Sequence, residues 1–258
     1  SAQRIEVLRG PFSALYGNHS GGVVQVFSES GATPPVIASD IEFGSYGFQR
    51  YSLKGLGATG AFNGMASASY FNVDGYRDHS AASKTQFNTK LAYEISPANQ
   101  LTLVANYFNQ PDAQDPLGLT QAQVQQNPRQ AQPVAIAFDT RRSLDNAQGG
   151  LIWDSALDER NALRVLAYVG SRSNEQFLAV PIDNQLAATS SGGVSSLDRN
   201  LSGAGVRWTT RQQLLDGPLT VNAGAEYDTS SEDRTGYINN FGVIGALAWA
   251  ASRWDLPA

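Results

Sequence analysis

Apolar and polar side chains alternate with a period of two along much of this chain. In residues 86–95, Phe87 and Leu91 fall on one face of an extended chain. Lys90 and Glu94 fall on the opposite face. The pattern recurs in residues 37–44, 50–54, 163–169 and 219–228. Such alternation is typical of β-strands with one apolar and one polar face, and helical periodicity is nearly absent. We therefore expect an all-β fold of antiparallel strands.

The expected strands are long and carry aromatic residues toward their ends. Several run for roughly ten residues, which suits a tilted strand that crosses a membrane. The aromatic residues near strand ends are Tyr46, Phe48, Tyr70, Phe71, Tyr107, Phe108 and Tyr227. Membrane barrels place such residues in girdles at the two membrane interfaces. A soluble β-sandwich also has alternating strands and stays open as an alternative.

Short and long connections alternate along the chain. The short ones are expected at residues 60–63, 96–100, 158–161 and 216–218. The long polar ones are expected at residues 74–83, 110–144, 171–200 and from 230 onward. Outer-membrane barrels have this asymmetry, with tight periplasmic turns and long extracellular loops. The short connection 45–49 is an exception. We expect about nine strands between residues 36 and 229, with residues 241–254 starting another.

The composition is compatible with a membrane barrel and excludes several other classes. Hydrophobic residues make up 41% of the 258 residues, mean hydropathy is −0.28, and no apolar run suits a membrane helix. In a barrel only alternate residues face lipid, so the average polarity is that of a soluble protein. The chain has no cysteine, which excludes disulfides and thiolate sites. A net charge of −5 without a basic block argues against nucleic-acid binding.

No motif predicts an enzyme, a cofactor site or a metal site. Residues 55–60 match the glycine pattern of dinucleotide-binding loops, but an alternating strand follows where that site needs a helix. A tight glycine turn is the better interpretation. The only two histidines, His19 and His79, are too few for a three-histidine metal site, and no nucleophile elbow accompanies them.

Two polar segments in the expected outer loops are candidates for ligand binding. One contains Tyr76, Arg77 and His79, and the other contains Arg141 and Arg142. The planar guanidinium of arginine suits carboxylate or phosphate-like ligands. The alternative is that these side chains are ordinary solvated loop charges.

Residues 4–24 predict a strand, a tight glycine-rich loop and a second strand. Within them, Ile5–Pro11, Ser13–Gly17 and Gly21–Val23 resemble the closing segment of the plug domain in TonB-dependent outer-membrane receptors. That family has a 22-stranded barrel with a plugged lumen. The resemblance implies that residues 1–35 are the end of a plug domain and its linker. It also implies that residues 36–258 are the N-terminal part of a transmembrane β-barrel, about nine or ten strands of the larger whole.

Three further segments are similar to a subgroup of that family linked to pyrroloquinoline quinone uptake. They are residues 11–18, 75–80 and 115–120. The family resemblance implies a receptor in the outer membrane of a Gram-negative bacterium, surrounded by lipid. Such a receptor captures a scarce small molecule, here a ferric siderophore or pyrroloquinoline quinone. The TonB–ExbB–ExbD complex supplies the energy. A passive porin-like barrel and a soluble β-sandwich binding module are the alternatives.

The resemblance also implies roles for four residues of the expected plug segment. Glu6 and Arg9 match plug charges that lock into the barrel wall, where Lys54, Lys90, Glu94 and Glu226 are possible partners. An ion pair within the plug is the alternative. Asn18 and His19 fall at the plug apex, which contacts ligand in the family. No signal peptide, TonB box or early plug segment is present, so we expect a truncated or processed chain that does not transport by itself.

Overall fold

The computed structural model describes residues 2–10, 21–215 and 217–253, and these form two antiparallel sheets. The small sheet pairs β1 (Ala2–Arg9) with β2 (Gly22–Ser28). The large sheet has ten strands, and each strand pairs with its neighbours in sequence. They are β3 (Val36–Phe43), β4 (Gln49–Thr59), β5 (Phe62–Val73), β6 (Ala82–Ser96), β7 (Asn99–Gln114), β8 (Arg141–Ala156), β9 (Asn161–Phe177), β10 (Val194–Leu214), β11 (Gly217–Asn240) and β12 (Val243–Arg253). The predicted all-β antiparallel fold is confirmed.

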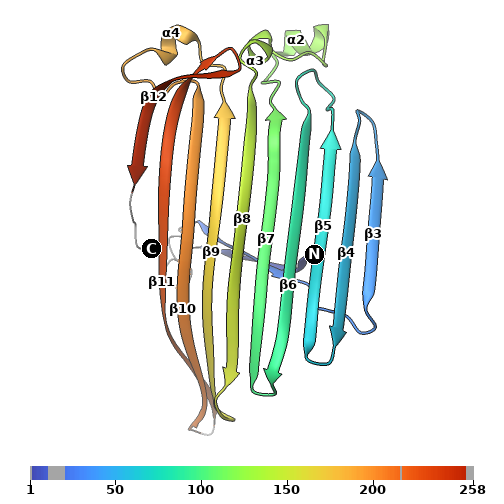
Figure 1. Ribbon diagram of the computed structural model, residues 1–258, viewed down its shortest axis with the longest axis vertical. Helices are drawn as coiled ribbons and strands as arrows, with labels where there is room; N and C mark the ends of the chain where they lie inside the picture. Colours follow the sequence, from blue (N-terminus) through green and yellow to red (C-terminus); the bar gives the residue numbers. More distant parts are fainter. Residues whose placement is uncertain (1, 11–20, 216, 254–258) are drawn as a thin grey trace.

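Three short helices lie in the connections at one end of the large sheet (Figure 1). They are α2 (Gln121–Gln126), α3 (Pro133–Ala137) and α4 (Ile182–Gln185). The strands meet in short turns at the other end, as the sequence predicts. In one of these turns the Asp158 carboxylate accepts hydrogen bonds from the backbone N–H groups of Arg160 and Asn161, each at 2.8 Å. The hydrogen bond from the Asn161 side chain has the largest effect, and together with these two backbone hydrogen bonds it lowers the pKa of Asp158.

In-register pairing gives the large sheet one apolar and one polar face. Leu91, Leu103 and Leu151 are direct partners across β6, β7 and β8, and all three lie on the face that we call the outer face. The opposite face, called the inner face, carries polar partners such as Gln100 and Asp154. Because side chains alternate along a strand, a slip of one residue in register would exchange the two faces.

Aromatic side chains flank the apolar part of the outer face. Phe62 and Tyr93 are paired across β5 and β6, with ring centroids 4.6 Å apart. Tyr51 and Tyr70 are paired nearer the other end of the strands. Phe62 and Tyr70 lie eight positions apart on β5, roughly 26 Å at about 3.3 Å per residue. In strands tilted by about 35–45° this corresponds to roughly 18–22 Å along the membrane normal, somewhat less than the apolar band of about 25 Å between the aromatic girdles of membrane barrels.

Several strands extend beyond the predicted boundaries, so the expected long loops are shorter. The segment from residue 230 onward is not a loop, because β11 continues to Asn240. The connection predicted at 110–144 spans only 115–140, and the one predicted at 171–200 spans only 178–193. The extensions are polar on both faces, so they carry no alternation for a sequence pattern to detect. Their ladders of backbone hydrogen bonds continue because pairing does not require apolar side chains.

The segment between the two sheets lies against the inner face. The N–H of Gly31 donates to Oδ1 of Asn63 at 2.8 Å, and the N–H of Ala58 donates to the carbonyl of Ala32 at 2.9 Å. A Cβ atom at Gly31 would stand 2.0 Å from the carbonyl oxygen of Gly57, so this close approach requires glycine. Residues 29–32 thereby join the small sheet to the wall formed by β4 and β5.

Replacing Leu151 with Arg tests the assignment of the outer face. We expect the free energy of unfolding in phospholipid bilayers to fall by about 2–4 kcal/mol, because a charged side chain would enter hydrocarbon. Gln148→Arg is the matched control on the inner face of the same strand and should cost much less. Equal losses in the two variants would contradict the assignment.

Candidate functional site

The helical end of the large sheet is an interlocked set of loops (Figure 1). The loop of residues 115–140 holds α2 and α3, and α2 begins with a capping box in which Thr120 and Gln123 bond each other's backbone N–H groups. The loop of residues 178–193 holds α4. Since both loops contain hydrogen-bonded helices, they have defined conformations rather than open polar tips.

Arg77 connects the loop of residues 74–81 to the loop of residues 115–140. Its guanidinium donates to the carbonyl oxygens of Leu117 at 2.7 Å, Gln130 at 2.9 Å and Pro116 at 3.1 Å. The three contacts use Nε, Nη1 and Nη2, so each guanidinium nitrogen is engaged within the protein. The structure therefore gives Arg77 a part in holding two loops together.

His79 and Arg141 hold the same end of the loop of residues 115–140. Nε2 of His79 lies 2.8 Å from the carbonyl oxygen of Thr140 and 3.7 Å from Oδ1 of Asp139. Only 10% of the His79 side chain is exposed. The Arg141 guanidinium donates to Oδ2 of Asp139 at 2.5 Å and lies 3.5 Å from the ring centroid of Phe177. Both residues are thus engaged inside the loop cluster.

The remaining loop candidates are more accessible. Tyr76 is 45% exposed and packs edge-on against Tyr46, with ring centroids 5.3 Å apart. Arg129 lies within 6 Å of both rings. Arg142 is exposed and donates to Oδ1 of Asn174 at 2.5 Å. Contrary to the sequence-based expectation, Arg141 and Arg142 are the first residues of strand β8 and not loop residues.

Sequence reasoning did not identify Arg129 or the buried pair formed by Asn239 and Gln185, and it placed Tyr46 among the aromatic residues at strand ends and not among the ligand-binding candidates. Oε1 of Gln185 accepts the backbone N–H of Asn239 at 2.6 Å. Nδ2 of Asn239 donates to the carbonyls of Phe138 and Leu178, at 2.8 and 3.1 Å. The pair therefore ties the loops of residues 115–140 and 178–193 to the end of β11. No local motif marks these residues, because their partners lie far away in sequence.

Of the four residues predicted in the plug segment, the structure describes Glu6 and Arg9. Nε of Arg4 lies 3.0 Å from Oε1 of Glu6, so Glu6 forms an ion pair within the small sheet. Arg9 is exposed at the end of β1. Asn18 and His19 lie outside the described residues. The locking role of Glu6 and Arg9 and the ligand-binding role of the apex residues stay predictions.

A different ion pair connects the linker to the wall. Nζ of Lys54 donates to the two carboxylate oxygens of Glu29, at 2.8 and 3.0 Å. Lys54 lies on the inner face of β4. The hydrogen bond from Lys54, which outweighs the opposing effect of burial, lowers the pKa of Glu29 below its ordinary value of 4.5. Sequence reasoning identified Lys54 as a wall charge but not this partner.

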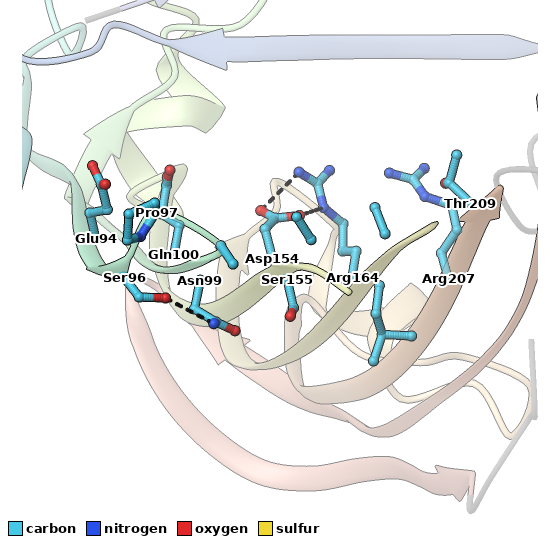
Figure 2. Close-up of a pocket in the computed structure, with 14 residues that line it drawn as sticks. Glu94, Ser96, Pro97, Asn99, Gln100, Asp154, Ser155, Arg164, Arg207 and Thr209 are labelled. Atoms are coloured by element: carbon cyan, nitrogen blue, oxygen red, sulfur yellow. Dashed lines mark hydrogen bonds and ion pairs between the residues drawn. The ribbon is translucent and has the colours of Figure 1, made fainter. Parts of the chain in front are cut away.

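A row of polar side chains crosses the inner face near the short turns (Figure 2). The members are direct cross-strand partners from β6 to β10, in the order Glu94, Gln100, Asp154, Arg164 and Arg207. Arg164 and Asp154 form a two-pronged ion pair, with contacts of 2.6 and 3.0 Å. The row lines a hollow of about 440 Å³, into which these side chains point. Its chemistry suits a charged or polar ligand and offers no nucleophile with an adjacent base.

The described part of the chain holds neither a cluster of metal-ligating side chains nor a helix that could span a membrane. No group of three or more histidine, cysteine, aspartate or glutamate residues there is arranged to hold a metal ion. None of the described helices is long and apolar enough to cross a membrane.

Solved structures match the chain over nearly its whole length, although no model of a known protein family does. The unliganded ferric citrate transporter FecA aligns with a TM-score of 0.69 and 18% identity, over 97% of this chain and 37% of that one. The ferric-catecholate import receptor Fiu from E. coli K12 aligns with a TM-score of 0.71 and 14% identity, over 95% and 44%. BauA, the ferric preacinetobactin receptor from Acinetobacter baumannii, aligns with a TM-score of 0.68 and 14% identity, over 100% and 40%.

The fold is that of TonB-dependent outer-membrane receptors. The chain spans about two fifths of the length of the solved structures that it matches. In a receptor barrel the long loops are extracellular and the short turns periplasmic. In these terms the interlocked loops lie at the extracellular end, here called the outer end, and the row from Glu94 to Arg207 lies at the periplasmic end, here called the inner end.

Replacing Arg77 with Ala tests its role in the loop cluster. We expect faster amide hydrogen exchange in residues 116–132, with local protection reduced by about 1–3 kcal/mol, because three carbonyls lose a charged donor. Arg142→Ala removes a guanidinium of the same region that bonds one side chain, and it should leave this exchange unchanged. Unchanged exchange in Arg77→Ala would contradict this role and would show that Arg77 is an ordinary solvated loop charge.

The Glu29–Lys54 pair predicts an acid-sensitive contact between linker and wall. The pKa of Glu29 is lower in the folded protein than in the unfolded chain. The stabilisation is therefore complete above the unfolded value and is lost as pH falls through the folded value. Below pH 4.5, the protection of the Gly31 and Ala58 amides, measured as the observed exchange rate relative to the intrinsic rate at the same pH, should fall. Glu29→Gln should show the reduced protection at every pH, and a pH-dependent response in that variant would contradict the assignment.

Proposed function

We propose that this chain belongs to a TonB-dependent outer-membrane receptor that takes up a scarce small molecule in a Gram-negative bacterium. The observation that carries the proposal is a ten-stranded wall whose outer face is apolar and whose polar inner face holds residues 29–32. A passive porin has no reason to hold such a segment against its inner wall. A soluble sandwich would cover the apolar face with a second sheet, whereas Ile37, Leu53, Val169 and Tyr227 are all more than half exposed.

On this proposal residues 1–35 are the end of the plug and its linker, and residues 36–258 are the first part of the barrel. The receptor depends on the TonB–ExbB–ExbD complex for energy, because ligand has to pass a plugged lumen. The protein binds and transports its ligand without enzymatic chemistry. The three matched proteins described above are likewise transporters and receptors by name.

Two ligand classes have separate support. The fold likeness favours a ferric siderophore, because the matched proteins are named for ferric citrate, ferric catecholates and ferric preacinetobactin. The sequence likeness of residues 75–80 and 115–120 favours pyrroloquinoline quinone. Arg77, in the first of these segments, donates to the carbonyls of Pro116 and Leu117 in the second. Residues 75–80 and 115–120 are therefore in direct contact, which supports treating their two sequence likenesses as one feature.

Ligand binding at the outer end is proposed for Asn18, His19, Tyr76, Arg77, His79, Arg141 and Arg142. Among the described members, Tyr76 and Arg142 are exposed and have side chains available to a ligand. Arg77, His79 and Arg141 act chiefly by holding the loops that carry the contacts. Arg129 joins the set because it is exposed and lies beside Tyr76.

Growth under limitation tests the proposal and discriminates between the ligands. A strain that lacks the receptor is complemented with the gene and given one ferric siderophore at a time, or pyrroloquinoline quinone, as the limiting nutrient. We expect rescue by one ligand class, and loss of that rescue when TonB is deleted. Rescue that persists without TonB would favour the passive barrel. Rescue by neither class would exclude both ligands.

A further inference from the structure

The inner face carries two pairs of arginines that face each other across β9 and β10. Arg172 is the direct partner of Arg199, and Arg164 is the direct partner of Arg207. Cβ atoms of such partners are about 4.5–5.5 Å apart, and like charges placed directly opposite each other repel. Each pair therefore needs nearby negative charge.

The two pairs differ at the neighbouring position on β11. The partner of Arg199 on that strand is Glu232, whose carboxylate accepts hydrogen bonds from Nε and Nη2 of Arg199. The partner of Arg207 at the equivalent position is Gly224. Glu232 also accepts a hydrogen bond from Arg234, and among the residues that the structure describes no ion pair is recorded for Arg172. Each pair thus has one arginine with a carboxylate partner, Arg199 in the upper pair and Arg164 in the lower pair nearer the short turns. Beside Arg207 the β11 position carries no side chain.

Asp154 compensates only one member of the lower pair. It binds Arg164 through two contacts of 2.6 and 3.0 Å. Within residues 2–10, 21–215 and 217–253, the structure records no ion pair for the exposed guanidinium of Arg207. Arg207 and Arg164 point side by side to the same side of the wall, into the hollow of about 440 Å³ (Figure 2).

The segment that lies against the wall does not supply the missing anion. Residues 1–35 contain only two acidic residues, Glu6 and Glu29. Glu6 pairs with Arg4 at 3.0 Å, and Glu29 pairs with Lys54 at 2.8 Å. Among the residues that the structure describes, Arg207 is an exposed charged donor at the short-turn end of the inner face.

We propose that Arg164 and Arg207 form a binding site for the carboxylate of a small anionic molecule at the inner end of the barrel wall. The guanidinium fork matches a carboxylate through two parallel hydrogen bonds, as the Asp154–Arg164 pair already shows. Placed between the two guanidinium groups, the carboxylate relieves their repulsion. This inference rests on the proposed uptake function. In that function the ligand binds this site after it has passed the small sheet and before it leaves the lumen.

Calorimetric titration of the purified, detergent-solubilised protein with citrate tests the site. We expect Arg207→Gln to weaken citrate binding by about tenfold or more, because a charged, two-pronged contact is lost. Arg207→Lys keeps the charge without the fork and should bind with intermediate affinity. Arg160→Gln, which removes an arginine of the neighbouring short turn, is the matched control and should bind citrate like the unsubstituted protein.

The outcomes separate this site from the uptake proposal. Equal citrate affinity in the Arg207→Gln variant and the unsubstituted protein, or no citrate binding at millimolar concentration, would overturn the inference. Inorganic phosphate binding as tightly as citrate would overturn its assignment to carboxylates. In cells, Arg207→Gln should slow uptake of the rescuing ligand while leaving its binding at the cell surface unchanged. If no ligand rescues growth, the uptake proposal fails, and the citrate titration still decides this site.

Discussion

In-register pairing of ten consecutive strands is the constraint on which the other features of this protein depend. Within this sheet each strand from β4 to β11 bonds to the strands before and after it in sequence, and β3 and β12 form the edges. Each position faces the same side of the wall as its direct partners. The row of Leu91, Leu103 and Leu151 on one face and the row from Glu94 to Arg207 on the other are consequences of one register. Because a single-residue slip would exchange the faces, the apolar surface and the charged lumen are specified together.

The outer end shows how side chains that suit ligand recognition serve first to build the loops. A guanidinium has five N–H donors, and those of Arg77 reach three carbonyls of a neighbouring loop. The buried amides of Asn239 and Gln185 satisfy backbone groups of three separate segments. Polar networks that are buried and fully bonded make the backbone around them rigid. Such a scaffold presents Tyr76 and Arg129 on a defined surface.

The lumen contains two kinds of charge arrangement. Near the linker, Lys54 and Glu29 form a closed pair that joins residues 29–32 to the wall. On β9 and β10, positive charge recurs at two levels, and each level has one carboxylate partner, Glu232 for Arg199 and Asp154 for Arg164. Where water has access, charges of this kind cost little to keep and can exchange partners. The β11 neighbour of Arg199 is Glu232, whereas the β11 neighbour of Arg207 is Gly224, which supplies no carboxylate.

The sequence by itself determined the all-β class, the alternation of faces and the short turns of the large sheet, and also the strand pattern of the small sheet. A period of two and turn residues are local signals, which is why the sequence shows them. It left the ends of β7, β9 and β11 undefined, since their polar extensions carry no alternation although their backbones stay paired. It identified Arg77, His79 and Arg141 as polar residues with potential chemistry, and only the tertiary structure decided that each is engaged by a neighbouring loop. It offered no signal for the Glu29–Lys54 pair or for Arg207 beside Gly224. These contacts join positions that are distant along the chain, and only strand register brings them together.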